Sequence, residues 1–449
     1  MSHSDDKRIY VSVFLQGEGF VPAGTILFND VMNYAGFVYF KSYADNHYPP
    51  LNPGTLNYQT QHSLQFPIDV KANPEMLDRT FWELLPSQGD FGTNVLISRF
   101  PEYFSMTNVQ KLYFLGSRVV GGLSCYVDKP KSEQNIVGAD WLDDIRRESV
   151  AFHTKQLTSI KHVNALDALT SYGGVRPKAM FKDDNGDCWI AKFNLPSDPY
   201  NMARVEHVAM QMAGDCGLVV PDTKVITLSS GDDVFLTKRF DRTDTARFHG
   251  LSFYAVAPAI DFERAKPIAG QGHTASVMGK LVSRFSQNKR QDQEGLARKL
   301  LVDIGFNNTD NHLRNIRFML NEQNQWAVSP SFDILFDPRD KPHTYGPAGL
   351  SRGETHLNNE QVIKQIAGYT ELSFEQVYLF AEQTKKTLDD WHTYALSANL
   401  SSQDMLKLEN AISIGTLGPE ATFRLEEQKR LKFTANKTPA APIPRPKFK

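Results

Sequence analysis

The sequence has few cysteines, little net charge and no long apolar run. Its 449 residues contain three cysteines, Cys125, Cys188 and Cys216. They lack Cys-x-x-Cys spacing and cannot form a closed set of disulfides, so we expect buried or idle thiols. The formal net charge of -2 produces no global attraction to nucleic acid or anionic membranes, although it leaves room for local basic patches. No stretch approaches the roughly 20 apolar residues that span a bilayer.

Several motifs that would suggest other classes of protein are also missing. The Gly-Lys-Ser/Thr of a P-loop is absent, as are internal repeats and heptads. The N-terminus leads into an alternating pattern rather than an uninterrupted apolar segment, which disfavours a secretory signal. Hydrophobic residues make up 41% and charged residues 22%, as in ordinary globular proteins. We therefore expect a cytoplasmic protein with more than one domain.

The first 130 residues show the pattern of a β-rich module. Ile9, Val11, Val13 and Leu15 alternate on one face of a predicted strand. Further strand candidates and short apolar segments follow at residues 25–28, 36–40, 81–86, 112–115 and 121–127. A linker is expected at 129–135 and a charged helix at 140–158. We assign packing and partner contact to this module, and no chemistry.

The most informative stretch runs from Gly305 to Asn315. A helical apolar stripe ends at Gly305, and a polar loop carrying Asp310 and Asn315 follows. A predicted hairpin, with strands at 315–320 and 326–328, then leads to Asp333. A carboxylate at a substrate hydroxyl, together with an amide and a second carboxylate on Mg²⁺, is the minimum for kinase-type phosphoryl transfer. A lone loop of this kind more often caps its own backbone, so the interpretation depends on the segments upstream.

One upstream segment is a glycine loop. Ser171 to Lys178 reads Ser-Tyr-Gly-Gly-Val-Arg-Pro-Lys and precedes a predicted strand at 179–182. Two adjacent glycines let backbone N–H groups close over an anion, and Arg176 and Lys178 add positive charge. Alone, Gly-Gly before a strand usually marks only a turn.

A strand lysine and a hinge candidate follow the loop. A turn at 183–187 returns the chain into a strand that ends near Lys192. A lysine there usually reaches solvent, but the order glycine loop, hairpin, lysine is the one in which kinases contact ATP phosphates. Glu206, on the next predicted helix, either orients Lys192 or is solvated. The strand at 233–240 ends in a hinge, where the backbone of 238–240 could pair with an adenine edge.

Taken together, five segments resemble the HipA-type serine/threonine kinases, the toxin half of bacterial HipBA toxin–antitoxin systems. They are Ser171–Lys178, Lys192, Lys238–Arg242, Asn308–Asn315 and Ser329–Leu335. The resemblance runs from the N-terminal module to about residue 420. It implies an α+β protein with a two-lobed fold similar to that of protein kinases. The N-terminal lobe would be β-rich with an extra β module, and the C-terminal lobe mainly helical.

The resemblance also suggests how the chain is divided. The expected parts are an N-terminal β-rich module at 1–130, the nucleotide-binding part of the N-lobe at 131–242, a helical C-lobe with the catalytic loop at 243–433, and a tail at 434–449. The tail is rich in proline and lysine, and such a composition predicts a flexible extension.

Roles for single residues follow from the same resemblance. Asp310 matches the catalytic base, Asn315 and Asp333 match the Mg²⁺ ligands, and Ser171 matches a serine that family members autophosphorylate to switch themselves off. The expected ATP-binding residues come from the nucleotide loop, the phosphate lysine, the hinge, the catalytic loop and the segment before Asp333. They are Gly173, Gly174, Val175, Arg176, Lys178, Lys192, Lys238, Arg239, Phe240, His312, Arg314 and Phe332.

The resemblance further implies partners. The best-known substrates of the family are aminoacyl-tRNA synthetases, and its partner is a HipB-like DNA-binding antitoxin that holds the kinase inactive. DNA contact would then be indirect or through basic patches. The chain departs from the type toxin at Arg176-Pro177, where that toxin has Gln-Glu, and in a longer Pro/Asn loop at 46–54. These departures fit a divergent or solitary member of the family.

Two other classes of function were weighed. A non-catalytic, nucleotide-responsive regulator that binds an antitoxin and DNA could use the same fold, but retention of Lys192, Asp310, Asn315 and Asp333 argues for catalysis. A metal-dependent hydrolase built on Asp310, His312 and Asp333 would need more ligands than the sequence groups together. The preferred hypothesis is an ATP- and Mg²⁺-dependent protein kinase.

Overall fold

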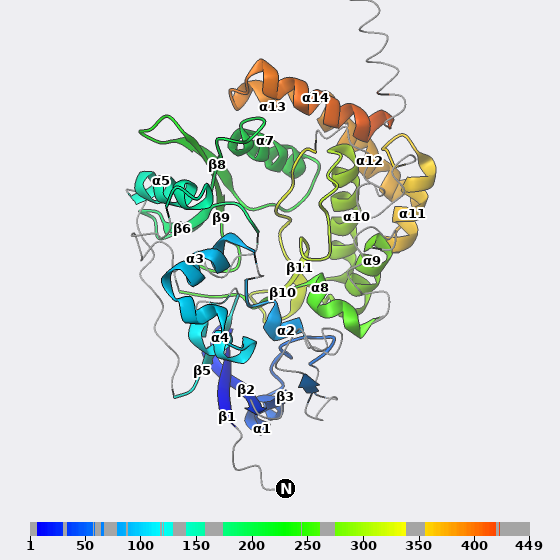
Figure 1. Ribbon diagram of the computed structural model, residues 1–449. Coiled ribbons are helices and arrows are strands. Elements are labelled where there is room, and N and C mark those ends of the chain that lie inside the picture. The colour runs from blue at the N-terminus through cyan, green and yellow to red at the C-terminus, as the bar shows by residue number, and fades with distance from the viewer. Residues whose placement is uncertain are drawn as a thin grey trace, which may run out of the picture.

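The computed structural model has three bodies (Figure 1). A β-sheet module lies at one end, a second sheet lies beside it, and a group of helices forms the other side. The described residues are 7–29, 34–56, 58, 64–66, 79–86, 89–116, 119, 121–128, 141–157, 174–243, 245–260, 274–337, 355–418 and 422. The predicted linker at 129–135 and the predicted tail at 434–449 lie outside these residues.

The N-terminal module is built on a five-stranded antiparallel sheet with the order β4-β3-β2-β1-β5. The alternating residues Ile9, Val11, Val13 and Leu15 are all at most 2% exposed, which confirms the predicted first strand. The strands are β1 (Lys7–Leu15), β2 (Gly19–Asn29), β3 (Tyr34–Tyr39), β4 (Leu64–Phe66) and β5 (Leu123–Tyr126).

Helices occupy more of this module than the sequence pattern indicates. Residues 112–115, which we placed in a β-rich module, lie on a helix that ends at Leu115. Thr107 and Gln110 form a capping box at its start, and such a box satisfies two backbone N–H groups that a helix end leaves unpaired. The helices are α1 (Lys41–Asp45), α2 (Arg79–Trp82), α3 (Phe91–Arg99) and α4 (Asn108–Leu115).

The second body is a four-stranded antiparallel sheet with the order β6-β7-β9-β8. Its core includes Phe181, Trp189 and Leu236, and also Phe91 and Val95 from α3. Helix α3 therefore packs into the core of this sheet. The elements are α5 (Leu142–His153), β6 (Lys178–Lys182), β7 (Cys188–Phe193), α7 (Met202–Asp215), β8 (Thr223–Thr227) and β9 (Asp233–Lys238).

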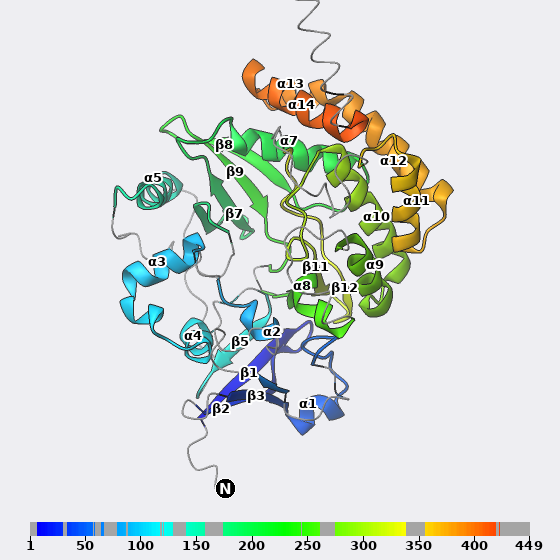
Figure 2. The same ribbon diagram turned by 45° about the vertical axis from the view of Figure 1, so that its right-hand side comes forward.

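The remaining body is mainly helical and contains a small three-stranded sheet with the order β10-β11-β12. Helices α13 and α14 lie beside α7 of the second body (Figures 1 and 2). The elements are β10 (Gly250–Ser252), α8 (Phe253–Val256), α9 (Thr274–Phe285), α10 (Lys289–Gly305), β11 (Arg317–Leu320), β12 (Trp326–Val328), α11 (Glu360–Thr370), α12 (Phe374–Asp389), α13 (Trp391–Ser397) and α14 (Ser402–Leu417).

Helix α10 runs through the centre of this body and is buried almost all round. It ends at Gly305, as the sequence predicts. Asn307 then takes a φ of 52°, the left-handed conformation that asparagine tolerates after a helix. Gly415 of α14 packs so closely on this end that an added Cβ would lie 2.3 Å from the carbonyl oxygen of Gly305. No helix among the described residues has the length and apolarity to cross a membrane.

Candidate active site

The centre of the candidate site is a contact between one lysine and two carboxylates from three separate elements. Lys192 Nζ on β7 lies 2.5 Å from Glu206 Oε1 on α7 and 2.7 Å from Asp333 Oδ1, which follows the β11–β12 hairpin. The side chain of Glu206 is 7% exposed, that of Lys192 23% and that of Asp333 40%. Lys192 is therefore not a surface lysine, and Glu206 orients it.

The charges of this cluster hold one another in place. Burial would lower the pKa of Lys192, but Asp333 and Glu206 together raise it above its ordinary value. The Lys192 ammonium, with smaller contributions from Lys178 and His312, lowers the pKa of Asp333 to about 2. Burial raises the pKa of Glu206 against the opposing effect of Lys192. A charged lysine and an ionised Asp333 at neutral pH are what a phosphate- and metal-binding site requires.

Asp333 also has an unusual backbone. Its φ is 58°, in the left-handed region that residues other than glycine rarely adopt. Two residues earlier, the Ser331 amide donates to the Val219 carbonyl at 2.7 Å, which ties this segment to the loop after α7. Such a conformation persists where its surroundings determine it, and it is common at functional sites.

The loop between α10 and β11 presents Asp310 at the surface. Asp310, His312 and Arg314 are exposed, whereas Asn311 is 5% exposed. Asn315 Nδ2 donates to the Asp310 carbonyl at 2.7 Å. The amide nitrogen of Asn315 is therefore engaged, and its amide oxygen is the atom that could bind a cation. His312 is near enough to Asp333 for its charge to contribute to the low pKa there. The predicted catalytic and metal-binding residues thus lie on the loop after α10 and on the segment after the hairpin.

Asn315 and Asp333 fit a Mg²⁺ site by their chemistry. Mg²⁺ takes oxygen ligands, keeps several waters, and is usually held by one or two protein side chains together with substrate phosphates. A carboxylate and an amide oxygen satisfy that requirement. In the part of the chain that the structure describes, no three His, Cys, Asp or Glu side chains are grouped as a metal site, so the hydrolase hypothesis finds no ligand set there.

The glycine loop is anchored to helix α3. The Gly174 amide donates to Asp90 Oδ1 at 3.0 Å, and the Phe91 amide donates to the Gly174 carbonyl at 3.1 Å. Gly174 has a φ of 103°, and a Cβ there would lie 3.0 Å from Lys178 Nζ. Burial, followed by repulsion from Lys192, lowers the pKa of Lys178 to about 8. Ser171 and Gly173 lie outside the described residues.

The basic side chain that follows Gly174 contacts the protein itself. Arg176 makes a two-pronged ion pair with Asp198, with distances of 2.8 and 2.5 Å. Asp198 also accepts the Leu195 amide at 2.7 Å. Val175 is 62% exposed. In this conformation Arg176 braces the loop after β7, and its predicted contact with ATP stays a prediction.

At the hinge, two of the three predicted side chains are also engaged with the protein. Lys238 Nζ lies 2.7 Å from Asp187, and Arg239 is buried in an ion pair with Asp241 at 2.5 Å. The rings of Phe240 and Phe332 have centroids 5.6 Å apart. An apolar wall made by these two rings, rather than the charged side chains, is the part of the hinge suited to a flat base.

Comparison with known proteins gives the family and the fold of the chain. The sequence matches the family model described as the HipA-like C-terminal domain over residues 170–395. The chain belongs to this family. The matched range contains every predicted site residue from Ser171 to Asp333.

The fold extends the match to the N-terminal module. It is similar to a chain in the structure of the Shewanella oneidensis MR-1 toxin–antitoxin system HipA, HipB and its operator DNA complex. The TM-score is 0.66 at 12% identity, over 94% of this chain and 99% of that chain. The Helicobacter pylori proinflammatory kinase CtkA aligns over 51% of this chain and 95% of its own, with a TM-score of 0.34 and 17% identity. No curated protein matches the sequence. The protein has the α+β, two-lobed HipA-like kinase fold.

Two features that position the HipA-like site were not predicted. Asp303, buried in the last turn of α10, contacts the catalytic loop, although Lys299 and Asp303 look like an ordinary surface pair at i,i+4 spacing. Helix α13 and its C-cap Ala398 hold α7, because Arg204 donates to the Ala398 carbonyl at 2.7 Å and Tyr394 Oη to Asp215 at 2.6 Å. The sequence carries little signal for the contacts of Asp303, because α10 contains many charged and polar residues and only its packing shows that Lys299 and Asp303 are buried.

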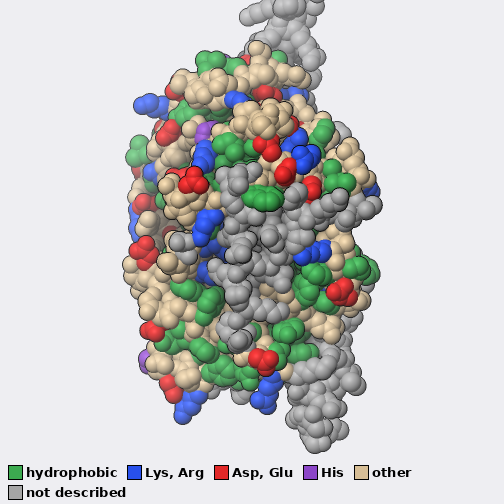
Figure 3. All heavy atoms as spheres, turned by 90° about the vertical axis from the view of Figure 1, so that its left-hand side faces the viewer, with side chains coloured by type: hydrophobic (Ala, Val, Ile, Leu, Met, Phe, Trp, Pro, Cys, Tyr) green, Lys and Arg blue, Asp and Glu red, His purple; other side chains and the backbone are tan. Residues whose placement is uncertain are grey.

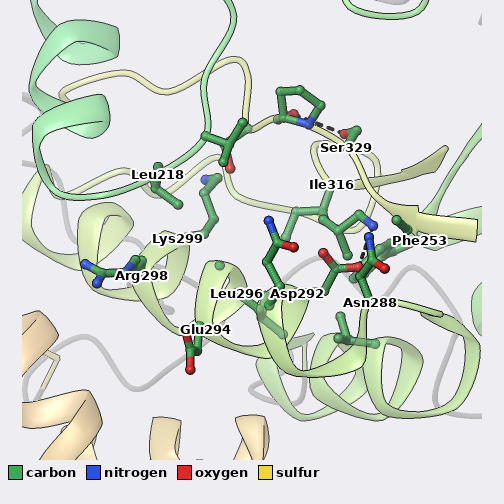
Figure 4. Close-up of a pocket in the computed structure, with 18 of the residues that line it drawn as sticks. Leu218, Phe253, Asn288, Asp292, Glu294, Leu296, Arg298, Lys299, Ile316 and Ser329 are labelled. Carbon is green, nitrogen blue, oxygen red and sulfur yellow. Dashed lines mark hydrogen bonds between the residues drawn. The ribbon is translucent and has the colours of Figure 1, made fainter. Parts of the chain in front are cut away.

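A cavity of about 350 Å³ lies between α10, the loop after α7 and the segment after β12 (Figure 4). It is lined by Leu218, Asp292, Lys299, Ser329 and Asn315, among others. Lys192, Glu206, Asp310 and Asp333 do not line it. The cavity therefore does not contain the lysine–carboxylate cluster, although the predicted metal ligand Asn315 lines it.

Proposed function

We propose that the protein is an ATP- and Mg²⁺-dependent serine/threonine protein kinase of the HipA type. The observation that carries this proposal is the contact of Lys192 with both Glu206 and Asp333. A lysine held by a helix glutamate and adjacent to a metal-binding aspartate is the arrangement that phosphoryl transfer requires. Membership of the HipA-like family supports the same assignment.

The residues divide the work of the reaction. Lys192 and Lys178 bind the ATP phosphates, while Phe240 and Phe332 contact the adenine. Asn315 and Asp333 hold the metal, which when bound neutralises charge on the phosphates. Asp310 accepts, or orients, the proton of the substrate hydroxyl. The remaining predicted ATP contacts are the loop residues Gly173, Gly174, Val175 and Arg176, the hinge residues Lys238 and Arg239, and His312 and Arg314. Most of the rate enhancement comes from positioning and electrostatics.

The biological role follows as a part of the proposal. The protein is the toxin of a toxin–antitoxin system, phosphorylates a translation-related protein such as an aminoacyl-tRNA synthetase, and is switched off by autophosphorylation at Ser171. A HipB-like DNA-binding antitoxin is its partner. On the face seen in Figure 3, acidic and basic side chains are interspersed over the described surface. The described part of this face therefore presents no uniformly basic surface to DNA, and the DNA contact proposed here is the indirect one through the antitoxin.

The test is phosphoryl transfer from labelled ATP by the purified protein, followed by mass spectrometry of the labelled sites. Asp310→Asn should reduce the rate by a factor of at least 10², or about 3 kcal/mol in the barrier, without loss of folding. Asp389→Asn, an exposed change on α12, is the matched control and should transfer phosphate normally. ATP binding without transfer in the unmutated protein would favour the non-catalytic regulator instead.

A further inference from the structure

One buried carboxylate contacts the catalytic loop, residues 306–315, at two points. Asp303 is 0% exposed and accepts hydrogen bonds on both oxygens. Lys299 Nζ lies 2.5 Å from Oδ1 and 2.6 Å from Oδ2. Asn308 Nδ2 donates to Oδ1 at 2.8 Å, and Asn311 Nδ2 donates to Oδ2. A single side chain thus collects three donors, two of them from the loop.

The two loop contacts lie on either side of Asp310. Asn308 and Asn311 are 3% and 5% exposed, whereas Asp310 between them is exposed. Asn308 Oδ1 in turn accepts the Asp310 amide at 3.3 Å. A continuous path of hydrogen bonds therefore runs from Asp303 through Asn308 to the backbone of Asp310, and from there to Asn315, which donates to the Asp310 carbonyl.

The chemistry of this position calls for a carboxylate. Both oxygens of an ionised carboxyl group are acceptors, whereas an amide would present a donor to one of the asparagine N–H groups. A buried charge also needs a partner, and Lys299, itself 3% exposed, supplies it one helical turn earlier on α10. Lys299 also lines the cavity in Figure 4. Lys299 and Asp303 thus form a buried ion pair on α10. Burying the two charges costs desolvation free energy, and the Asp303 side of the pair contacts the catalytic loop.

We infer that Asp303 is a positioning residue that sets the orientation of Asp310 and Asn315 through Asn308 and Asn311, with Lys299 as its counter-ion. This inference rests on the proposed kinase function. Asp303 touches neither substrate nor nucleotide, so its effect should appear in the chemical step and not in ATP binding. A displacement of about 1 Å in a catalytic group can cost about 10²-fold in rate.

The main test replaces the pair by apolar residues, Lys299→Met with Asp303→Leu. Exchanging both members leaves no unpaired charge, and such exchanges are often neutral for stability. We expect kcat to fall about 10²-fold, with the KM for ATP within about threefold of the original. The melting temperature should fall only by what the unpaired amide groups of Asn308 and Asn311 cost. Asp292→Asn is the control, since Asp292 is a buried carboxylate of the same helix whose side chain accepts from Ser286 and from the Val328 amide, and not from the described residues 308–315.

A kcat within threefold of the original in the folded double variant would overturn the inference. If that variant loses stability, Asn311→Ala decides, because it keeps the ion pair and removes one loop contact. A lowered kcat with unchanged ATP affinity and melting temperature supports positioning, and an unchanged kcat refutes it.

The inference can also be separated from the proposed function. If the unmutated protein transfers no phosphate, hydrogen exchange of the amides of residues 308–315 replaces the kinetic measurement. Faster exchange in the double variant and in Asn311→Ala, but not in Asp292→Asn, would show that Asp303 orders the loop. Equal exchange in all four proteins would refute the inference whatever the activity of the protein.

Discussion

Removing the ammonium of Lys192 should cost stability as well as activity. The whole residue Glu206 is 5% exposed, and its carboxylate lies 2.5 Å from Lys192 Nζ. Lys192→Met therefore leaves the Glu206 carboxylate buried without a counter-charge. Breaking one side of a buried pair costs about 3–5 kcal/mol. Asp333 is 40% exposed, and solvent screens its share of the interaction. We therefore expect a loss near the lower limit, about 3 kcal/mol in the free energy of unfolding.

The assay is denaturant unfolding of Lys192→Met, Glu206→Gln and the double variant. Because Lys192→Met/Glu206→Gln leaves only the part-exposed Asp333 without its lysine, it should regain most of the stability that Lys192→Met loses. Its affinity for ATP should remain low, because the ATP phosphates have lost their contact with Lys192. Equal unfolding free energies for Lys192→Met and the unmutated protein would show that the contact with Glu206 is not energetically coupled, and the argument for an orienting glutamate would fail.

Three further outcomes are expected. Gly174→Ala should weaken ATP binding in a nucleotide titration, because the φ of 103° and the 3.0 Å approach to Lys178 do not suit a side chain; unchanged affinity would contradict this. Ser171→Asp should abolish ATP binding if phosphate there repels the nucleotide, whereas only slight destabilisation would indicate a turn cap. The stability difference between the unmutated protein and Asp333→Asn should be constant above about pH 5 and shrink as the pH falls from about 4 towards 2, because the folded pKa of Asp333 is lowered to about 2; a difference that persists at pH 2 would contradict it.

The local order of the site was predictable from the sequence. A helix ending at Gly305, a polar loop and a hairpin leading to Asp333 follow from apolar spacing and turn residues, and the structure has them in this order. The contact of Lys192 with Glu206 was one of two alternatives, because a sequence shows that a strand and a helix are neighbours along the chain but not which helix face meets the strand.

The other features of the site and fold depend on tertiary contacts, which the sequence does not show. The engagement of Arg176 by Asp198 and of Arg239 by Asp241 depends on which of several nearby carboxylates a basic side chain reaches. Asp303 was missed because a lysine and an aspartate one turn apart are usually solvated. The helix over residues 112–115 was missed because a short apolar run fits a strand or a helix equally well.

The packing of α3 has a consequence for how the protein can be divided. The residues of α3 precede the linker predicted at 129–135, yet Phe91 and Val95 belong to the core of the four-stranded sheet, and Asp90 and Phe91 hold Gly174 by two hydrogen bonds. A fragment beginning at residue 141 would lack both that core and that anchor. The N-terminal module is therefore not an appendage that evolution or an experimenter can exchange freely. A molecule that binds α3 and displaces it would also displace the glycine loop, because the two are joined by these hydrogen bonds.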